Sequence, residues 1–397
     1  MRGGQHSDGR ARRARVGAAA CFLLTGFVFA TFASRVPAIK GDLGITDGQL
    51  AIGFVGLNAG AILGLQLGGM LVSRTGSRPA LVVGLLAFAG TLLLPAIVPN
   101  LSALVAALFL LAVLNSVVDV AMNAQGVTVQ RLLGRPALSG MHAMHSLGGV
   151  LGAGAGSLAA RLDAAPPTHF LVAGAVAAAA CLAVSPLLLP SREDAEDGPS
   201  VDGHGAAAGV SSWLRGWSLP VAVLGMLAFC FTLADGAALD WSAVYVSDSL
   251  GGSAALGAAG LGVFLGAVTL ARLAGDRLVS RFGPVRIFRA GAVIASAGFG
   301  GALLMNAPPA GLVGLGLLGA GIANALPLAI GAGSNAPGEA PATAAARVST
   351  LAYLGSFVGP ALIGRLATLW SLPLALGLPA VLVLATAFGA RAVRPAG

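Results

Sequence analysis

The chain has 397 residues, of which 56% are hydrophobic and only 10% are charged, and its mean hydropathy is +0.88. Soluble domains carry about 25% charged residues, so a water-soluble protein of this length could not bury so much apolar surface. The net charge of +8 is therefore read as basic residues placed beside membrane spans rather than as a nucleic-acid-binding surface, and the composition indicates a polytopic membrane protein.

Apolar segments long enough to cross a bilayer recur along the whole chain. A hydrocarbon core of about 30 Å needs roughly 20 apolar residues in a helix. We expect an all-α integral membrane fold with twelve transmembrane helices, six on each side of an acidic, Gly-rich stretch that starts at Ser191. The expected spans are 16–38, 48–72, 79–98, 101–126, 138–160, 168–189, 218–246, 253–279, 285–305, 309–332, 342–367 and 371–390.

The first apolar run has the basic start and the small residues of a signal peptide. From Val16 to Ser34, however, it is long enough to span a bilayer. We interpret it as an uncleaved first helix, because its removal would leave an odd number of spans.

The stretch between the two sets of spans is rich in Gly and acidic residues, which is typical of a flexible linker. The expected organisation is a cytoplasmic N-terminal tail at 1–15, an N-terminal six-helix half at 16–190, the linker at 191–217, a C-terminal six-helix half at 218–390 and a cytoplasmic C-terminal tail at 391–397.

The basic residues predict the orientation of the chain. With the N-terminus in the cytoplasm, 19 of the 23 lysines and arginines lie on the cytoplasmic side, which is the bias that membrane insertion follows. The opposite side holds Arg35, Lys40, Arg161 and Arg365. We therefore expect a multi-pass protein of the cell (plasma or inner) membrane with both termini in the cytoplasm.

One basic, Gly-punctuated turn occurs twice, as GGMLVSRTGSRPAL at 68–81 and as GDRLVSRFGPVRI at 275–287. The turns fall after the second and the eighth spans, at equivalent places in two halves of the same orientation. Parallel six-helix repeats of this kind are the architecture of one large class of transporters. The shared residues are Gly68, Leu71, Val72, Ser73, Arg74 and Gly76, which recur as Gly275, Leu278, Val279, Ser280, Arg281 and Gly283.

The pattern G-x-x-L-V-S-R-x-G-x-R of these turns resembles the signature loop of the major facilitator superfamily, and the resemblance covers the whole chain. It implies two six-helix halves in parallel repeat that close on the cytoplasmic face at these turns. The family has an Asp where this chain has Ser73 and Ser280; a serine can still cap a helix end, and Asp276 can supply the missing charge in the second half. The residues expected in the gating loops are Gly69, Ser73, Arg74, Gly76, Arg78, Asp276, Ser280, Arg281 and Gly283.

Two further stretches resemble MosC-like and fucose-permease-like transporters. They are DVAMNAQGVTVQRLLGRPALSGMHAMHSLGGVLGAG at 119–154 and DGAALDWSAVYVS at 235–247. Substrates in that subgroup are mostly sugar-like or unassigned, so the resemblance names no substrate. It also implies that Asp119 matches an acid implicated in proton coupling in fucose-permease-like proteins.

Asp119 lies well inside the fourth span, where a charged side chain costs about 2.5–3.5 kcal/mol. Asn115, Asp119 and Asn123 are spaced by four residues and share one helix face, as expected for the wall of a water-filled cavity. We interpret Asp119 as a proton-coupling residue; the alternative is a neutral or hydrogen-bonded Asp that locks the fourth and fifth helices together. His142 and His145 start the fifth span as a polar pair or a proton relay, and as zinc ligands they lack a clear third partner.

Two more acids lie within the seventh span, and each can contact the substrate or pair with a neighbouring helix. Asp235 and Asp240 stand about 140° apart around an ideal helix, so both reach one cavity only if the helix is irregular, which Gly236 permits. The expected substrate-binding residues are Asn58, Asn115, Asn123, Asp235, Asp240, Asn324 and Tyr353.

Motifs for other functions are absent from the sequence or out of place. GLGLLG at 314–319 fits a dinucleotide-binding pattern but lies in an apolar span with no preceding strand. The sequence has no Walker A motif and no G-x-S-x-G, and Cys21, Cys181 and Cys230 lie in apolar runs without metal-ligand spacing. We expect no enzymatic activity, no cofactor and no metal.

Together these features predict a secondary transporter that works by alternating access, and proton-coupled uptake of a sugar, polyol or related solute is the leading hypothesis. The expected partners are a small-molecule substrate, protons and the lipid bilayer, without nucleic acid, and a monomer would suffice. A proton-coupled exporter of the same fold is one alternative, although the Gly-Pro pair typical of such exporters falls here at Gly359-Pro360 in the eleventh span instead of the fifth. A non-transporting membrane sensor is the other, which the presence of Asp119 and Asn123 weakens.

Overall fold

The computed structural model describes residues 2–134, 137–190, 217–336 and 341–394, and the regular structure in these ranges is helical throughout. Contacts between residues divide the chain into two compact units, residues 1–45 with 52–202, and residues 46–51 with 203–397. Of the predicted linker only its last residue, Trp217, falls within the described ranges, and the predicted domain bounds stay a prediction.

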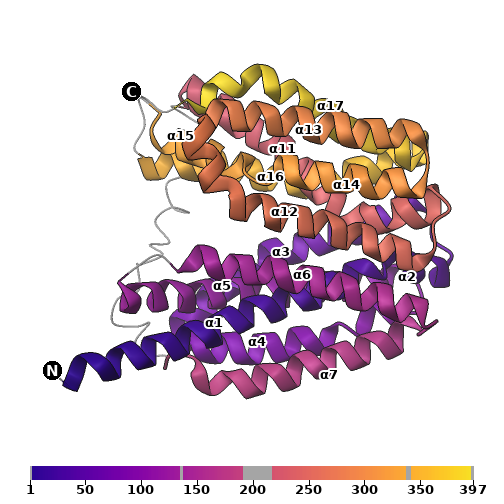
Figure 1. The fold of residues 1–397 in the computed structure, drawn as a ribbon. Helices are drawn as coiled ribbons and strands as arrows, with labels where there is room; N and C mark the ends of the chain where they lie inside the picture. The colour runs from indigo at the N-terminus through magenta and orange to yellow at the C-terminus, as the bar shows by residue number, and fades with distance from the viewer. Residues whose placement is uncertain (1, 135–136, 191–216, 337–340, 395–397) are drawn as a thin grey trace. The chain divides into compact units, whose positions relative to one another are not determined.

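The described residues of the first unit form seven helices and two short 3₁₀ turns (Figure 1). The N-terminal residues predicted as a tail are helical from Arg2 on, because α1 begins there. The first turn of α3 is grouped by its contacts with the second unit. The elements are α1 (Arg2–Ser34), α2 (Val36–Leu43), α3 (Asp47–Thr75), α4 (Ser77–Thr91), η1 (Leu94–Ala96), α5 (Leu101–Leu133), α6 (Leu138–Arg161), α7 (Pro166–Val184) and η2 (Ser185–Leu187).

The second unit is built in the same way, with two departures. One apolar segment is broken into the two helices α14 and α15, and a π-helical turn follows α11. The elements are α11 (Leu219–Val244), η3 (Tyr245–Ser249), α12 (Ala254–Phe282), α13 (Pro284–Met305), α14 (Pro308–Ile322), α15 (Ala325–Ser334), α16 (Pro341–Leu369), α17 (Leu372–Gly389) and η4 (Ala390–Val393).

Helix ends are set by capping residues that the sequence carries. Asn100, Ser253 and Ser371 precede α5, α12 and α17, and each side-chain oxygen accepts a hydrogen bond from the N–H three residues on. Gly134 ends α5 with a φ of 61°, a left-handed conformation that glycine adopts at no steric cost.

In the described part of the chain, eleven segments are long and apolar enough to cross a membrane. The predicted fifth span, α6, is not among them, because its glycines and its two histidines lower its hydropathy. Its 24 residues still extend over about 36 Å at 1.5 Å per residue, which exceeds the hydrocarbon thickness. With α6 the count is the predicted twelve.

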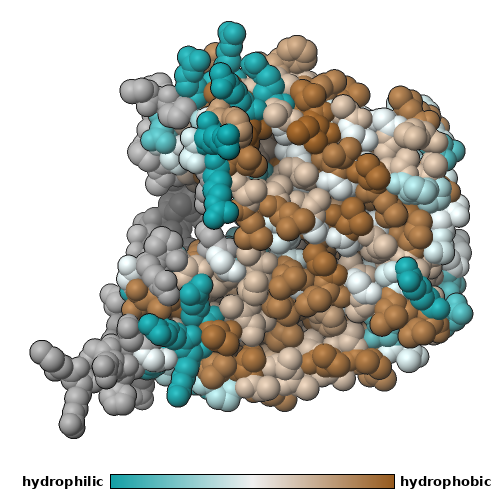
Figure 2. Space-filling view, in the orientation of Figure 1, coloured by the Kyte–Doolittle hydropathy of each residue, from teal (hydrophilic) through white to brown (hydrophobic). Residues whose placement is uncertain are grey.

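Large hydrophobic side chains are exposed along the helices of both units. Val83, Leu270 and Phe388 are 66%, 70% and 87% exposed. On the face shown in Figure 2, hydrophobic side chains cover the middle of the helices and the most hydrophilic ones gather near helix ends. This distribution is expected where the outer surface of a helix bundle meets lipid.

Glycines bring α1 and α6 into backbone contact, and Figure 1 shows the two helices side by side. A Cβ at Gly148 would overlap the carbonyl of Leu23, and one at Gly152 would overlap the carbonyl of Phe27. Small residues are what allows transmembrane helices to approach this closely.

The helices α11 and α16 form the corresponding contact in the second unit. The hydroxyl of Thr232 donates to the carbonyl of Ala352, and Ser356 Oγ donates to the carbonyl of Thr232 at 3.3 Å. A Cβ at Gly355 would overlap the Phe229 carbonyl. This interface therefore combines close glycine packing with hydrogen bonds between helices.

The duplicated turns have the same backbone conformation. Gly76 has φ 83° and ψ 164° between α3 and α4, and Gly283 has φ 81° and ψ 154° between α12 and α13. Only glycine adopts this region readily, which explains why this residue recurs in both turns.

The capping role expected of the two turn serines is wrong. Ser73 donates to the carbonyl of Met70 and Ser280 to that of Arg277, both at 2.9 Å. Because α3 and α12 continue past these serines, each hydroxyl bonds within its own helix, and the N-cap positions of α4 and α13 are the two glycines.

We expect Gly148→Ala to destabilise the protein by about 1–3 kcal/mol, because the added methyl forces two backbones apart. The measurement is the apparent Tm of the purified protein in detergent. Gly154→Ala, on the same helix, is the matched control, since a Cβ there meets nothing within 4 Å. Equal Tm values for the two variants would contradict the described packing of α6 on α1.

Candidate functional site

The predicted polar stripe lies on α5. Asn115, Asp119 and Asn123 are all half-buried. Asn123 Nδ2 donates to the backbone carbonyl of Asp119 at 2.8 Å and to its carboxylate Oδ1 at 3.3 Å. The amide thus fixes one carboxylate oxygen, and the second oxygen is available to a proton or a solute.

A turn earlier on the same face, the side-chain oxygen of Asn115 is buried, and among the described residues nothing donates to it. Buried polar atoms normally have a partner, and water or a ligand supplies one where the protein does not. The stripe therefore offers two acceptors, on Asn115 and Asp119.

Gln125 is a contact residue that sequence reasoning missed. It is buried, and its Nε2 donates to Ser77 Oγ at 2.7 Å and to the Leu189 carbonyl at 3.0 Å. Its Oε1 accepts from the N–H of Leu189 at 3.2 Å. The side chain therefore holds α5 to the start of α4, directly after the first duplicated turn.

His142 and His145 lie on α6, where His142 is exposed and His145 is half-buried. The His142 ring packs edge-on against Phe22 of α1, with ring centroids 5.0 Å apart. In the described ranges no group of three or more His, Cys, Asp or Glu could hold a metal ion. The prediction of a polar pair or a proton relay is not tested by these contacts.

A buried basic pair that the site prediction left out lies near the end of α1. Arg35 is 5% exposed and donates from Nη2 to the carbonyl of Ala164 at 2.7 Å. His169 on α7 is also buried and feels the charge of Arg35. Arg35 therefore ties the end of α1 to the loop between α6 and α7, and both residues lie on other elements than the Asp119 stripe.

In the second unit, α11 is a regular helix through both of its acids, and its irregular turn comes later, at Tyr245. Asp235 and Asp240 are half-buried and lie within electrostatic range of each other. The irregularity near Gly236 that would have let both acids face one cavity is absent from α11 as described, and the two acids point to different sides of the helix.

Asp235 has a basic neighbour that sequence reasoning missed. The charge of Arg272 on α12 acts on Asp235, and Arg272 Nε donates to the carbonyl of Ala323 at 3.3 Å. An arginine inside an apolar run, TLARLAG, was the available signal. The spacing of residues in the sequence could not predict its partner, a carbonyl 51 residues away.

Asp240 follows Gly236 by one turn, on the side of α11 that packs on α16. A Cβ at Gly236 would lie 3.5 Å from the carbonyl oxygen of Ser356. Pro360, inside α16, has no N–H to bond this carbonyl. A carboxylate and a carbonyl without its helical donor thus lie along the same interface, one turn of α11 apart.

The remaining predicted substrate residues differ in exposure. Asn58 on α3 is half-buried, and Tyr353 on α16 is 73% exposed. Asn324 stands at the break between α14 and α15, where its Nδ2 donates to the carbonyl of Ala271 at 3.1 Å. Asn324 is therefore engaged with α12.

The predicted gating residues lie where each duplicated turn ends a helix. The side chains of Ser73, Arg74 and Arg281 are exposed, and the guanidinium of Arg281 lies 5.3 Å from the ring centroid of Phe282. The side chain of Asp276, predicted to replace a missing charge, lies outside the described residues.

Solved structures with this arrangement of helices are membrane transporters. A mutant of the nucleoside transporter NupG matches with a TM-score of 0.73 at 13% identity, over 97% of this chain and 99% of that one. A D-xylose-proton symporter matches with a TM-score of 0.73 at 15% identity, over 97% and 98%. A mutant of the Escherichia coli fucose:proton symporter FucP matches with a TM-score of 0.61 at 16% identity, over 96% and 98%.

Sequence relatives agree with the fold. An uncharacterized MFS-type transporter of Yersinia pestis is 32% identical over 372 residues, 94% of each chain. The membrane protein MosC of Rhizobium meliloti is 26% identical over 374 residues, 92% of this chain and 86% of MosC. The family model of the Major Facilitator Superfamily matches residues 18–360, so this chain belongs to that superfamily of multi-pass membrane transporters.

Proposed function

We propose that this transporter couples the uptake of a small hydrophilic solute, such as a sugar or polyol, to the entry of protons. The observation that carries the proposal is the Asp119–Asn123 pair on α5. A carboxylate at this depth in a span is costly unless it serves function, and its amide partner leaves one oxygen open to a proton.

The chemistry of Asp119 suits a proton carrier. Ionised, the carboxylate accepts the Asn123 amide hydrogen; protonated, it becomes a donor to a solute or water. Protonation also removes a charge from the membrane interior, which lowers the free energy of states that shield the residue from water. Binding and release of one proton would therefore bias which side of the membrane the site faces.

The second unit supplies acceptors for the solute. Asp240 and the Ser356 carbonyl lie along the interface of α11 with α16, and a solute rich in hydroxyl groups has the donors that they require. Asn115 of the first unit adds a buried acceptor. This predominance of acceptors favours a polyhydroxylated solute over a lipophilic cation, which carries few hydrogen-bond donors.

The solved structures of similar fold support the same class of solute. Two of the solved structures are a fucose:proton and a D-xylose-proton symporter, and a third is a nucleoside transporter. The bias of basic residues supports an inner- or plasma-membrane location with both termini in the cytoplasm. The two units would rock against each other as a monomer, as in other parallel-repeat transporters.

Asp119→Asn should abolish proton movement driven by the solute, because the amide cannot carry a proton. The measurement is the change in external pH when lightly buffered cells that overproduce the protein receive sugars, polyols, amino compounds or lipophilic cations. We expect alkalinisation with one hydrophilic solute, reduced at least about tenfold in Asp119→Asn.

Asp163→Asn is the matched control for this experiment. Asp163 lies exposed between α6 and α7 with a φ of 51°, a conformation that Asn tolerates. Proton movement with lipophilic cations instead of hydrophilic solutes would contradict the proposed uptake and indicate export. Undiminished alkalinisation in Asp119→Asn would show that this residue does not couple protons to transport.

Asp240→Asn should weaken solute binding, because an amide is a poorer acceptor for hydroxyl donors than a carboxylate. We expect the KM for the solute to rise about tenfold while the maximal rate changes less than about threefold, as for the loss of ground-state binding. Asp248→Asn, an exposed acid of η3 on the same segment, should leave both constants unchanged. A fall in maximal rate at constant KM would contradict the assignment.

A further inference from the structure

The segment 308–334 is interrupted in its middle. The helix α14 ends at Ile322 and α15 begins at Ala325, with Pro327 in its first turn. Proline has no N–H, so the carbonyl of Ala323, four residues before it, lacks its helical donor. An unbonded carbonyl within a membrane span is costly, and another group has to supply the donor.

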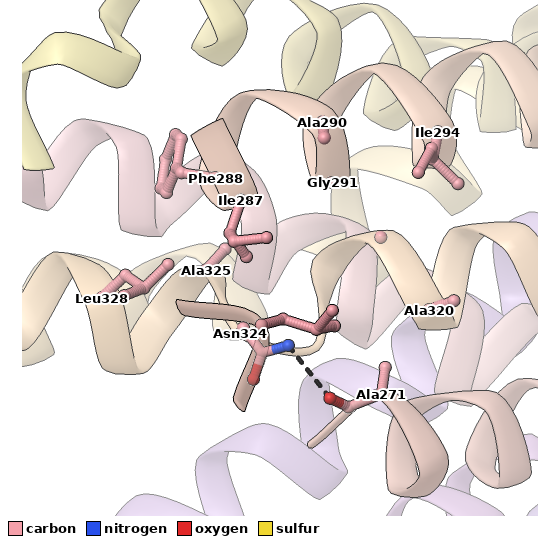
Figure 3. Close-up of a pocket in the computed structure, with 12 residues that line it drawn as sticks. Ala271, Ile287, Phe288, Ala290, Gly291, Ile294, Ala320, Asn324, Ala325 and Leu328 are labelled. Carbon is pink, nitrogen blue, oxygen red and sulfur yellow. Dashed lines mark hydrogen bonds between the residues drawn. The ribbon is translucent and has the colours of Figure 1, made fainter. Parts of the chain in front are cut away.

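Two neighbouring residues of α12 meet this break. Arg272 Nε donates to the carbonyl of Ala323 at 3.3 Å. The carbonyl of Ala271 accepts from Asn324 Nδ2 at 3.1 Å, the hydrogen bond that Figure 3 shows. The four residues form a reciprocal pair of hydrogen bonds, called here the break clamp. A Cβ at Gly275, one turn on, would overlap the Asn324 side chain, so α12 approaches the break at a glycine.

The break also has room to move on one side. A cavity of about 130 Å³ lies between α12, α13, α14 and α15, and Figure 3 shows the Asn324 side chain among its apolar lining. The lining includes Ile287, Gly291, Ile294, Gly321 and Leu328. The clamp therefore holds a backbone that is not packed tightly from every direction.

A neutral donor would satisfy the Ala323 carbonyl as well as an arginine does. The guanidinium adds a charge, and that charge acts on Asp235 of α11, which in turn lies within electrostatic range of Asp240. Arg272 thus bonds the break between α14 and α15 and also acts by its charge on one acid of α11, Asp235.

We infer that Arg272 is a positioning residue for transport, which links the charge of Asp235 to the helix break at Ala323–Asn324 and so to the half-helix α15. The carboxylate of Asp235 attracts the guanidinium away from the Ala323 carbonyl. When a solute engages Asp235, Arg272 binds the carbonyl more firmly and the break becomes more rigid. The inference requires a transporter of this superfamily but does not depend on which solute it carries.

Hydrogen–deuterium exchange of the full-length protein in lipid nanodiscs, without added solute, tests the link. In Arg272→Gln, exchange of peptide amides covering 320–334 should become about tenfold faster. In Asp235→Asn it should become several-fold slower, since the competing charge is gone. Arg277→Gln, the same change five residues further along α12, is the matched control and should leave exchange at the break unchanged.

A double variant separates positioning from simple structural support. Pro327→Ala restores an N–H that can bond the Ala323 carbonyl, so Arg272→Gln/Pro327→Ala should recover slow exchange at the break. Transport of the solute found in the panel should nevertheless stay at least about tenfold below wild type, because the charge link to Asp235 is absent. Arg272→Lys, which keeps a charge and a donor, should retain most of the transport rate.

Three results would overturn the inference. Unchanged exchange in a folded Arg272→Gln protein would show that the clamp does not hold the break. Full transport by the double variant would show that Arg272 only stabilises the break and has no further role in transport. Unchanged or faster exchange in Asp235→Asn, whose arginine is intact, would remove the charge link even if Arg272→Gln failed to fold. If the solute panel found no substrate, the exchange results would still decide the clamp and the charge link.

Discussion

The rest of this structure depends on one constraint, that a backbone group within hydrocarbon needs a hydrogen-bond partner from the protein itself. Regular helices meet it without help. Wherever the chain departs from a regular helix, a donor from elsewhere has to be in place. Each departure therefore frees a backbone group that needs a partner from a side chain, from water or from a bound solute.

Two prolines of the second unit illustrate the two ways of meeting this constraint. Pro327 deprives the Ala323 carbonyl of its helical donor, and Arg272 supplies another from α12. Pro360 does the same to the Ser356 carbonyl, which faces Gly236 on α11 close to Asp240. The Ala323 carbonyl thus has a structural partner. The Ser356 carbonyl remains an acceptor that the proposed solute can bind.

Features that depend on a short local stretch of sequence were predictable. The span count, the duplicated turn with Gly76 and Gly283, and the Asp119–Asn123 contact follow from apolar length, from a repeated motif and from four-residue helical spacing. Each of these depends on residues close together in the chain. No contact between distant segments had to be known to predict them.

Contacts between distant segments were not predictable in the same way. Gln125 bonds residues 48 and 64 positions away, and Arg272 bonds a carbonyl 51 positions away. A glutamine or arginine in an apolar run shows that a partner is needed, but spacing does not say which one. The capping role expected of Ser73 was wrong because α3 continues past this residue to Thr75 and the N-cap of α4 is Gly76.

The acids of the two units differ in what balances them, and this difference bears on coupling. Asp119 has only the neutral amide of Asn123 as its bonded partner among the described side chains, so its charge is compensated by dipoles alone. Asp235 feels the charge of Arg272, so a proton there would leave a cation without its counter-charge. Since an uncompensated charge is the more costly state in a low dielectric, protonation neutralises the first site but unbalances the second. This difference supports the proposed assignment of the proton-carrying role to Asp119 and of a solute-binding role to the acids of α11.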